Sequence, residues 1–296
     1  MITQKAFAKI NLFLHVGNKR DDGFHPLQSL AVFTDAGDLL AIEPAPMLSL
    51  AIEGPFAAGL SGEGDNLVTR AARALDTKGA KLTLTKNLPV ASGIGGGSAD
   101  AAASLRGLSA LWNTNADLHA IGANLGSDIP VCVDSVPAFM EGRGEILRPL
   151  ESLPRIAMLL VNPGVAVPTR DVFAALTTRS GADMDLPRGR FRDTADLLRF
   201  LETTRNDLES PARQIQPVIS EALSAIAALP GALMTRMSGS GATCFGLFAD
   251  DDCCRRAADA LRKAHPGWWV APTFVPETGI ARDTIGQDIG PTEHGL

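Results

Sequence analysis

The stretch KNLPVASGIGGGSADAAASLRGL, from Lys86 to Leu108, places four glycines within five residues, directly before an alanine-rich segment. Glycine has no Cβ, so such a run lets the backbone take positive φ and approach a ligand closely. The residues just before it, KLTLTKN, alternate as in a strand, and after Gly97 the apolar residues recur at helical spacing. The sequence therefore predicts a strand, a glycine loop and a helix, in this order.

A glycine loop that leads into a helix is suited to binding phosphate. Its backbone N–H groups and the positive end of the helix dipole together form a cradle for an anion. A tight turn with close helix packing is the alternative. Two common nucleotide loops do not fit, because no lysine follows the glycines as in a P-loop, and Ser98 stands where the dinucleotide fingerprint from Gly93 requires its last glycine. We favour a nucleoside triphosphate held by a different loop.

The segment FAKINLFLHVG, residues 7–17, has the alternation of a strand. Lys9 and Asn11 fall on the same face, with Cα atoms about 6.6 Å apart at the usual rise of about 3.3 Å per residue. Taken alone, a lysine at such a position is more typical of a solvated strand edge. The next residues, NKRDDGFHPLQS from Asn18, are rich in turn formers and charge and predict a loop.

Further expectations concern the remainder of the first half. Residues 30–53 read as two strands around the turn DAGD, and residues 65–79 read as a helix that Asp65 or Asn66 caps and Gly79 closes. A helix over ADLHAIGANLG ends at Gly126. SDIPVCV then starts a strand, which leaves Asp128 at a helix-to-strand turn.

Two polar residues just after the glycines have simple structural explanations. Ser98 is placed to cap the helix, and its hydroxyl is also a possible Mg²⁺ ligand. Asp100 complements the helix dipole in the first turn.

The second half reads as an alternation of strands and helices. IAMLLV is a buried strand, VPTRDVFAAL starts a helix, and two further helices are separated by Pro217. A strand, the glycine-rich turn SGSG and another strand follow, and then a helix and a last strand. The tail from Gly279 is polar and is expected to be poorly ordered.

Composition narrows the class of protein. The chain has 296 residues, 45% of them hydrophobic, which suits a soluble protein of two domains. No apolar run reaches the ~18 residues of a membrane span, so we expect a cytoplasmic protein without membrane contact. The net charge of −6 argues against a nucleic-acid surface. The four cysteines show no metal-ligand spacing and are expected to be reduced.

PVASGIGGGSADAAA resembles the phosphate loop of the GHMP small-molecule kinases. AKINLFL and MSGSGATCF resemble the N-terminal and C-terminal motifs of the same family, in the same order along the chain. The resemblance implies an α+β fold in two domains, with an N-terminal half like ribosomal protein S5 domain 2 and a ferredoxin-like C-terminal half. We expect residues 1–152 to form the ATP-binding domain, 153–278 the C-terminal domain and 279–296 a tail, with the site in the cleft between the domains.

The resemblance also assigns roles to residues. Lys9 and Asp128 match the catalytic lysine and aspartate of the family, although an aspartate before Ile-Pro is by itself more typical of a turn. ATP and Mg²⁺ are the implied cofactors, and the Mg²⁺ ligands remain unassigned. The residues that match the ATP-binding loop are Pro89, Val90, Ala91, Ser92, Gly93, Ile94, Gly95, Gly96, Gly97, Ser98 and Ala99.

AKINLFLHVGNKRDDGFHPLQSL is most similar to the family members that phosphorylate the 2-hydroxyl of a cytidine diphosphate-linked methylerythritol in the non-mevalonate isoprenoid pathway. By this likeness Phe24 and Phe173 sandwich the cytosine, and His25 bonds to it, largely through its backbone. Asn11 and Thr169 are weaker candidates for substrate contacts. The family commonly has tyrosine where Phe24 stands, so a hydroxyl contact there is lost while stacking is kept.

Two alternatives remain open. Another GHMP kinase would act on homoserine or a mevalonate-like alcohol, but a small alcohol offers no base for DGFHPL to stack on. A nucleotide-binding protein without turnover would need neither Lys9 nor Asp128 at the acceptor hydroxyl. A monomer or a weak homodimer with a small-molecule substrate fits each of these readings.

Overall fold

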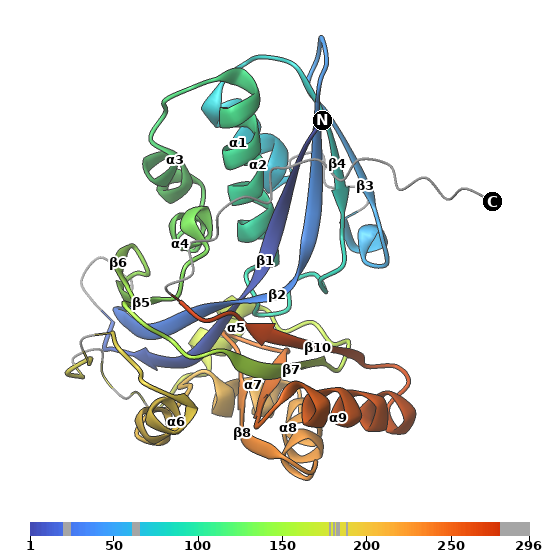
Figure 1. The fold of residues 1–296 in the computed structure, drawn as a ribbon. Helices are drawn as coiled ribbons and strands as arrows, with labels where there is room; N and C mark the ends of the chain where they lie inside the picture. Colours follow the sequence, from blue (N-terminus) through green and yellow to red (C-terminus); the bar gives the residue numbers. More distant parts are fainter. Residues whose placement is uncertain are drawn as a thin grey trace.

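The computed structural model of the chain shows two lobes, one above the other (Figure 1). It describes residues 1–19, 25–60, 66–177, 179, 181, 184–187 and 189–278. Residues 2–16 and 27–44 form two long strands that run through the upper lobe and reach the lower one (Figure 1). The tail from residue 279, which the sequence predicted to be poorly ordered, lies outside the described residues.

The described residues form strands and helices in both lobes. The strands are β1 (Ile2–Val16), β2 (Leu27–Pro44), β3 (Ser49–Glu53), β4 (Ala80–Thr85), β5 (Ala138–Gly142), β6 (Ile146–Pro149), β7 (Ile156–Asn162), β8 (Ala232–Met237), β9 (Cys244–Phe248) and β10 (Trp269–Val275). The helices are α1 (Leu67–Leu75), α2 (Gly96–Trp112), α3 (Leu118–Leu125), α4 (Ile129–Asp134), α5 (Thr169–Ala174), α6 (Thr194–Glu202), α7 (Glu209–Ile215), α8 (Val218–Ala227) and α9 (Asp251–Ala264), with a short 3₁₀ turn at Ala57–Leu60. None of the helices in the described ranges has the length and apolar character that crossing a membrane requires.

The upper lobe is built on a mixed six-stranded sheet. Its order is β3-β4-β2-β5-β6, and β1 pairs with β2. The long strand β2 is central, because its first part pairs with β5 and its last part with β4, while β1 runs antiparallel along most of it. Helices α1 to α4 gather together beside this sheet, and α2 packs against β1 and β2 (Figure 1).

The lower lobe is built on an antiparallel four-stranded sheet of order β10-β7-β9-β8. Counted along the chain, these strands lie in the order 4-1-3-2, with helices between the first and second strands and between the third and fourth. This is the ferredoxin-like βαββαβ arrangement. The predicted α+β class and the ferredoxin-like second half are confirmed.

A third hydrophobic core lies between the two sheets. Buried residues of β1, such as Ile10 and Leu12, share this core with Met158 and Leu160 of β7 and with Phe245 of β9. The lobes are therefore joined by a continuous apolar layer in addition to the chain connection. The chain passes from one sheet to the other between β6 and β7, and the predicted domain boundary after residue 152 stays a prediction.

Two local predictions in the first half were wrong. The DAGD segment is no turn between two strands, because β2 continues through it, with an irregularity in its pairing with β1 just before Gly37. Gly37 faces Phe7 of β1, and a Cβ on Gly37 would lie 2.5 Å from the Ala6 carbonyl oxygen. IPVCVD is a helix instead of a strand, and its residues Ile129–Val133 are all buried. A short apolar run that is buried on all sides carries no periodicity, so a strand and a helix look alike in sequence.

The helix ends were predicted in part. Asn66 does cap α1, its side chain accepting a bond from the Val68 N–H at 2.8 Å, but α1 ends at Leu75, before Gly79. Helix α2 begins at Gly96 with Gly95 as its N-cap, so Ser98 lies inside the helix and caps nothing. The glycines themselves form the start of the helix.

Arg236 joins β8 to elements of both lobes. Its buried guanidinium donates to the Leu12 carbonyl of β1 at 2.7 Å, to the Leu201 carbonyl at 3.1 Å, and to the carbonyl and hydroxyl of Thr204 at 2.8 and 3.0 Å. Burial lowers the pKa of Arg236 to about 10, which leaves the side chain charged at neutral pH.

We expect Arg236→Met to lower the free energy of unfolding by about 3 kcal/mol, because buried carbonyls lose charge-assisted partners. The measurement is urea unfolding at neutral pH. Arg155→Met is the control: it removes an exposed pair with Asp251 at 2.8 Å, and we expect a loss below about 1 kcal/mol. Equal losses in the two variants would contradict the role of Arg236.

Candidate active site

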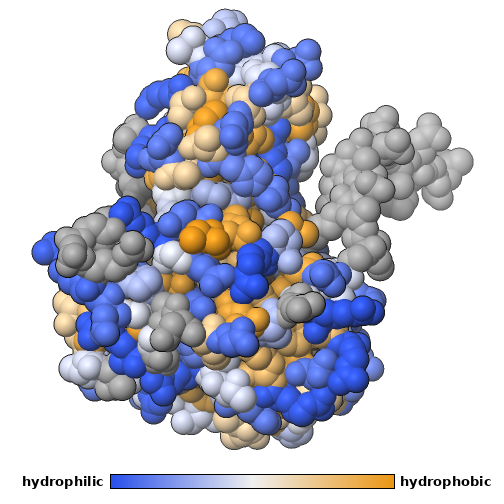
Figure 2. All heavy atoms as spheres, turned by 90° about the vertical axis from the view of Figure 1, so that its left-hand side faces the viewer, coloured by the Kyte–Doolittle hydropathy of each residue, from blue (hydrophilic) through white to orange (hydrophobic). Residues whose placement is uncertain are grey.

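A cavity of about 600 Å³ lies where the two lobes meet. Most of the glycine loop lines it, together with residues of β1, the start of α4, the start of α5 and the turn after β8. Figure 2 shows apolar surface gathered at the level where the lobes meet. The apolar side chains in the cavity wall include Leu14, Leu27, Leu67, Met140, Val167, Phe173 and Leu208.

The glycine loop needs its glycines for two separate reasons. Gly93 and Gly95 have φ of +75° and +65°, a region that residues with a Cβ rarely adopt. A Cβ on Gly93 would lie 2.5 Å from the Ser238 carbonyl oxygen, and one on Gly95 would lie 3.1 Å from the Lys9 Cβ. The loop therefore packs directly against the turn after β8 and against β1.

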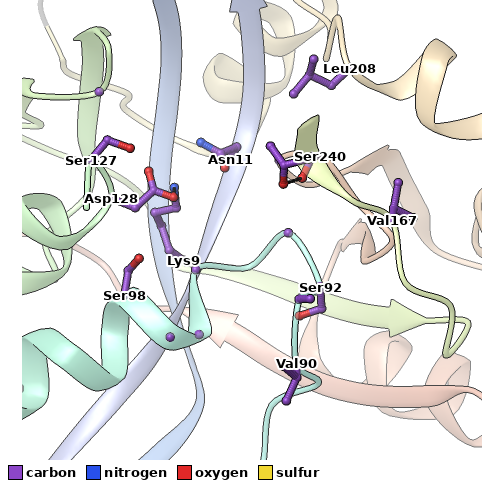
Figure 3. Close-up of a pocket in the computed structure, with 18 of the residues that line it drawn as sticks. Lys9, Asn11, Val90, Ser92, Ser98, Ser127, Asp128, Val167, Leu208 and Ser240 are labelled. Carbon is purple, nitrogen blue, oxygen red and sulfur yellow. Dashed lines mark hydrogen bonds and ion pairs between the residues drawn. The ribbon is translucent and has the colours of Figure 1, made fainter. Parts of the chain in front are cut away.

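Lys9 and Asp128 form an ion pair in the cavity wall. The Lys9 Nζ lies 2.7 Å from the Asp128 Oδ2, and the two side chains point toward one another (Figure 3). The Lys9 side chain is only 4% exposed, whereas the Asp128 side chain is 39% exposed. The reading of Lys9 as a solvated edge charge is thus wrong. The Lys9 N–H donates to the Ile94 carbonyl at 2.9 Å, which ties β1 to the glycine loop.

Asp128 occupies the N-cap position of α4, and not the expected helix-to-strand turn. Helix α4 packs against α2 and α3, so the carboxylate stands on a supported helix end. Because Asp128 makes no capping bond with its side chain, the carboxylate is available to the cavity. The elements that hold Lys9, Asp128 and the loop are thus in mutual contact.

The turn after β8 completes the wall beside the loop. The Ser238 hydroxyl donates to the Gly93 carbonyl at 3.0 Å and accepts from the Asn11 N–H at 3.1 Å. The Thr243 N–H donates to the Ser92 carbonyl at 3.1 Å. The second glycine motif therefore lies directly against the first.

The predicted substrate residues lie toward the lower lobe. Asn11 donates to the Ser29 hydroxyl at 2.7 Å, and Thr169 and Ser240 share a hydrogen bond of 2.8 Å. The Phe173 ring stacks on the His25 ring, with centroids 5.9 Å apart and planes inclined by 29°. His25 also bonds through Nδ1 to the Gly17 carbonyl at 3.0 Å. Phe24 lies outside the described residues.

The structure brings most of the predicted site residues to one cavity. Those that line it are Lys9, Asn11, Pro89, Val90, Ala91, Ser92, Gly93, Gly95, Gly96, Gly97, Ser98, Asp128, Thr169 and Phe173. Ile94 and Ala99 are instead buried in the cores. His25 reaches the cavity only through its contact with Phe173. The roles of all these residues stay predictions.

Sequence reasoning missed a buried ion cluster beside the loop. Lys86, just before the loop, bonds to Asp38 of β2 and lies 2.7 Å from the Asp100 Oδ2, and all three side chains are buried. The sequence had suggested that Asp100 complements the helix dipole, but Asp100 instead pairs with a lysine. Burial, partly offset by Lys86 and reinforced by the negative charge of Asp38, raises the pKa of Asp100 to about 7. Nothing in the local sequence around Lys86, Asp38 or Asp100 indicated that these charged side chains are buried.

Mg²⁺ fits this donor set only together with a phosphate-bearing ligand. The described residues contain no group of three or more His, Cys, Asp and Glu side chains able to hold a metal ion. Mg²⁺ in kinases is usually held by one or two protein oxygens along with substrate phosphates and water. The Asp128 carboxylate and the Ser98 hydroxyl, both in the cavity wall, are of the right kind.

The arrangement combines three chemical capacities. Glycine backbone and the N-terminus of α2 favour an anion, and the buried Lys9 ammonium adds positive charge next to it. The partly exposed Asp128 carboxylate can orient a hydroxyl or take its proton. Such a site can stabilise negative charge that develops on a transferring group.

Family comparisons agree with this geometry. Residues 66–142 match the family described as GHMP kinases N terminal domain, and residues 185–267 match GHMP kinases C terminal. The chain is 53% identical over 268 residues to a 4-diphosphocytidyl-2-C-methyl-D-erythritol kinase of Cereibacter sphaeroides (strain ATCC 17025 / ATH 2.4.3), an alignment that covers 90% of this chain and 96% of the relative.

Solved structures show the same relationship. A crystal structure of a 4-(cytidine 5'-diphospho)-2C-methyl-D-erythritol kinase superposes with a TM-score of 0.76 at 35% identity, covering 93% of this chain and 99% of that one. The mevalonate kinase of L. major in complex with R-mevalonate superposes with a TM-score of 0.68 at 16% identity, covering 94% and 97%. At that identity the second likeness concerns the fold alone.

Asp100 makes the stability of the protein depend on pH. Its pKa is about 7 in the folded state against the ordinary value of 3.8, so between these values the folded protein holds a proton that the unfolded chain has lost. The contribution of Asp100 to the free energy of unfolding is therefore fully present below about pH 4. It is lost as the pH rises toward about 7, by at most about 1.4 kcal/mol per pH unit.

We expect Asp100→Asn to remove this loss. In urea unfolding at pH 4.5, 5.5, 6.5 and 7.5, the variant should gain stability relative to the wild type as the pH rises. Asp35→Asn, which changes an exposed carboxylate that pairs with Lys5, is the control and should follow the wild-type curve. Parallel curves for Asp100→Asn and the wild type would contradict the raised pKa.

Proposed function

This chain belongs to the GHMP kinases, in the family of the 4-diphosphocytidyl-2-C-methyl-D-erythritol kinases, and we propose that it phosphorylates the 2-hydroxyl of 4-diphosphocytidyl-2-C-methyl-D-erythritol with ATP. It would thereby act in the non-mevalonate route to isoprenoid precursors. The single observation that carries the proposal is the Lys9–Asp128 pair of 2.7 Å, which lines the same cavity as the glycine loop.

ATP would bind along the glycine loop with Mg²⁺ and supply the phosphoryl group. Residues 89–93 and 95–98 line the cavity, and the positive end of α2 opens at Gly96. Gly93 and Gly95 allow the positive φ values that seat the loop against the turn after β8 and against β1, and the loop glycines carry no side chains where phosphates would approach. Ser98, in the first turn of the helix, offers a hydroxyl to the metal ion.

Lys9 and Asp128 would act on the acceptor hydroxyl. Asp128 accepts a hydrogen bond from the hydroxyl, orients its oxygen toward the loop and can take its proton. Lys9 holds the carboxylate in an ion pair of 2.7 Å and places positive charge beside the transferring group. The Lys9 ammonium is held by its burial and by its ion pair, and the bond from the Lys9 backbone N–H to Ile94 fixes β1 against the loop, so little reorganisation is needed during the reaction.

The nucleobase of the substrate would lie near Phe173 and His25. The two rings are already stacked on one another, and Phe173 lines the cavity. We propose that Phe173 covers one face of the cytosine and that Phe24, in the adjoining segment, covers the other. Asn11 and Thr169 would bond to the polar groups between the base and the acceptor hydroxyl.

We expect Asp128→Asn to lower kcat by about 10²- to 10⁴-fold, the range typical of a lost general base. The measurement is ADP release from Mg-ATP with 4-diphosphocytidyl-2-C-methyl-D-erythritol, with homoserine and mevalonate as comparison acceptors. Asp134→Asn, at the other end of α4 and exposed, is the control and should keep wild-type kcat.

Each outcome of this assay has a clear meaning. Turnover with the cytidyl substrate alone supports the proposed reaction. A preference for homoserine or mevalonate would move the chain to another GHMP kinase activity. Binding of ATP without ADP formation on any acceptor would make it a nucleotide-binding protein without turnover.

We expect Phe173→Ala to raise KM for the cytidyl substrate about 5- to 150-fold, because stacking of an aromatic ring on a base is worth about 1–3 kcal/mol. KM for ATP should change little, since Phe173 belongs to α5 and not to the glycine loop. Phe173→Leu keeps apolar volume without an aromatic face, so its KM for the cytidyl substrate should lie between those of the wild type and Phe173→Ala. An unchanged KM in Phe173→Ala would exclude stacking by this residue.

A further inference from the structure

Asp38 is the centre of a buried polar cluster at the foot of the glycine loop. Its Oδ1 accepts the N–H groups of Asn87 and Leu88 at 2.5 and 2.8 Å. Its Oδ2 bonds to the Lys86 ammonium, which also lies 2.7 Å from the Asp100 Oδ2. Asp38 is fully buried, and no periodicity or motif marks it in the sequence.

The cluster joins the two ends of the loop. Asn87 and Leu88 stand where the chain enters the loop, and Asp100 stands on α2, where the chain has left it. A Cβ on Gly96, the first residue of α2, would lie 3.1 Å from the Lys86 Nζ and 3.9 Å from the Asp38 Oδ2. One connected set of buried charges therefore fixes the entry and the exit of the loop relative to each other and to β2.

Lys86 and Asp100 also line the cavity at the loop end, and one polar atom there is unsatisfied. Asp100 Oδ1 is buried and has no hydrogen-bond partner among the described residues, whereas both oxygens of Asp38 are used within the protein. Asp38 itself is absent from the cavity wall. Its effect on a ligand must therefore pass through the loop or through Lys86.

We propose that Asp38 is a positioning residue for the nucleotide: by holding the Asn87 and Leu88 N–H groups while Lys86 and Asp100 close the cluster, it sets the glycine loop in its phosphate-binding shape. The loop is then organised before the nucleotide arrives, and binding does not have to order it. This inference rests on the proposed function for the identity of the ligand, but the contacts on which it is built belong to the protein alone.

Two double variants separate the acceptor from the ion pair. Asp38→Asn with Lys86→Met removes the charged pair but keeps an oxygen that can accept the two N–H groups. Asp38→Leu with Lys86→Met removes the pair and the acceptor together. Both double variants leave the buried Asp100 without its lysine partner, so this cost is common to the two and the difference between them reports the acceptor alone. Asp35→Asn with Lys5→Met is the control, an exposed pair of 2.7 Å near the same strands.

The first measurement is calorimetric binding of a non-hydrolysable Mg-ATP analogue. We expect the control to bind within about threefold of the wild type, and the Leu–Met variant to bind at least about tenfold more weakly than the Asn–Met variant, a difference of about 1.4 kcal/mol. Equal affinities in the Asn–Met and Leu–Met variants would overturn the positioning role.

The second measurement is hydrogen exchange of peptides that span residues 86–98, without nucleotide. Exchange should be faster in the Leu–Met variant than in the Asn–Met variant, while peptides of the four-stranded sheet should be unchanged. This readout needs no ligand. A wild-type protein that bound no nucleotide would thus refute the proposed function, and the exchange rates would still decide the role of Asp38.

If the Leu–Met variant does not fold, the single variant Asp38→Glu provides the test instead. It keeps the charge but moves the carboxylate by one methylene, so we expect KM for ATP to rise at least about fivefold while kcat stays within about twofold. A purely structural defect would lower the active fraction, and with it the apparent kcat, at an unchanged KM. That pattern would overturn the proposal.

Discussion

Two glycine-rich turns, almost 150 residues apart in the chain, lie backbone against backbone, and the whole site depends on this contact. The Ser238 hydroxyl bonds to the Gly93 carbonyl, and a Cβ on Gly93 would come within 2.5 Å of the Ser238 carbonyl oxygen. β1 is tied to the same place, because the Lys9 N–H reaches Ile94 and the Asn11 N–H reaches Ser238. One glycine turn comes from each lobe, so the contact fixes the cavity at their junction.

Two buried lysines flank the loop, and their partners separate their functions. Burial of an ammonium group is costly unless a carboxylate compensates it, and each lysine has such a partner. Asp128, which pairs with Lys9, is 39% exposed and faces the cavity, so this pair can meet a substrate. Asp38 and Asp100, which pair with Lys86, are buried. The first pair is therefore suited to chemistry and the second to holding the loop.

Sequence reasoning was reliable where a short-range rule decides the structure, and it was wrong where packing does. Asn66 as a helix cap and the strand–turn–strand around Ser238 were predicted correctly from local signals. Gly37 in DAGD was read as part of a turn, although it serves the close approach of β1 to β2. The residues after Asp128 form a helix, because the surrounding elements bury every side of a run that has no period of its own.

The kind of protein could be recognised from the chain alone, because its glycine motifs and their order resemble those of the GHMP kinases, and the family comparisons agree. Glycine stands in these motifs because the backbone conformations they require exclude most other residues. The same motifs pointed to Lys9 and Asp128 as the candidates for chemistry. It took the folded arrangement to show that Lys9 is buried and paired, that the second glycine turn supports the first, and that Asp38 and Lys86 belong to the loop. The physical reason is that burial and pairing arise between segments far apart in the chain, and neither a lysine nor an aspartate carries a local mark of the partner it will meet.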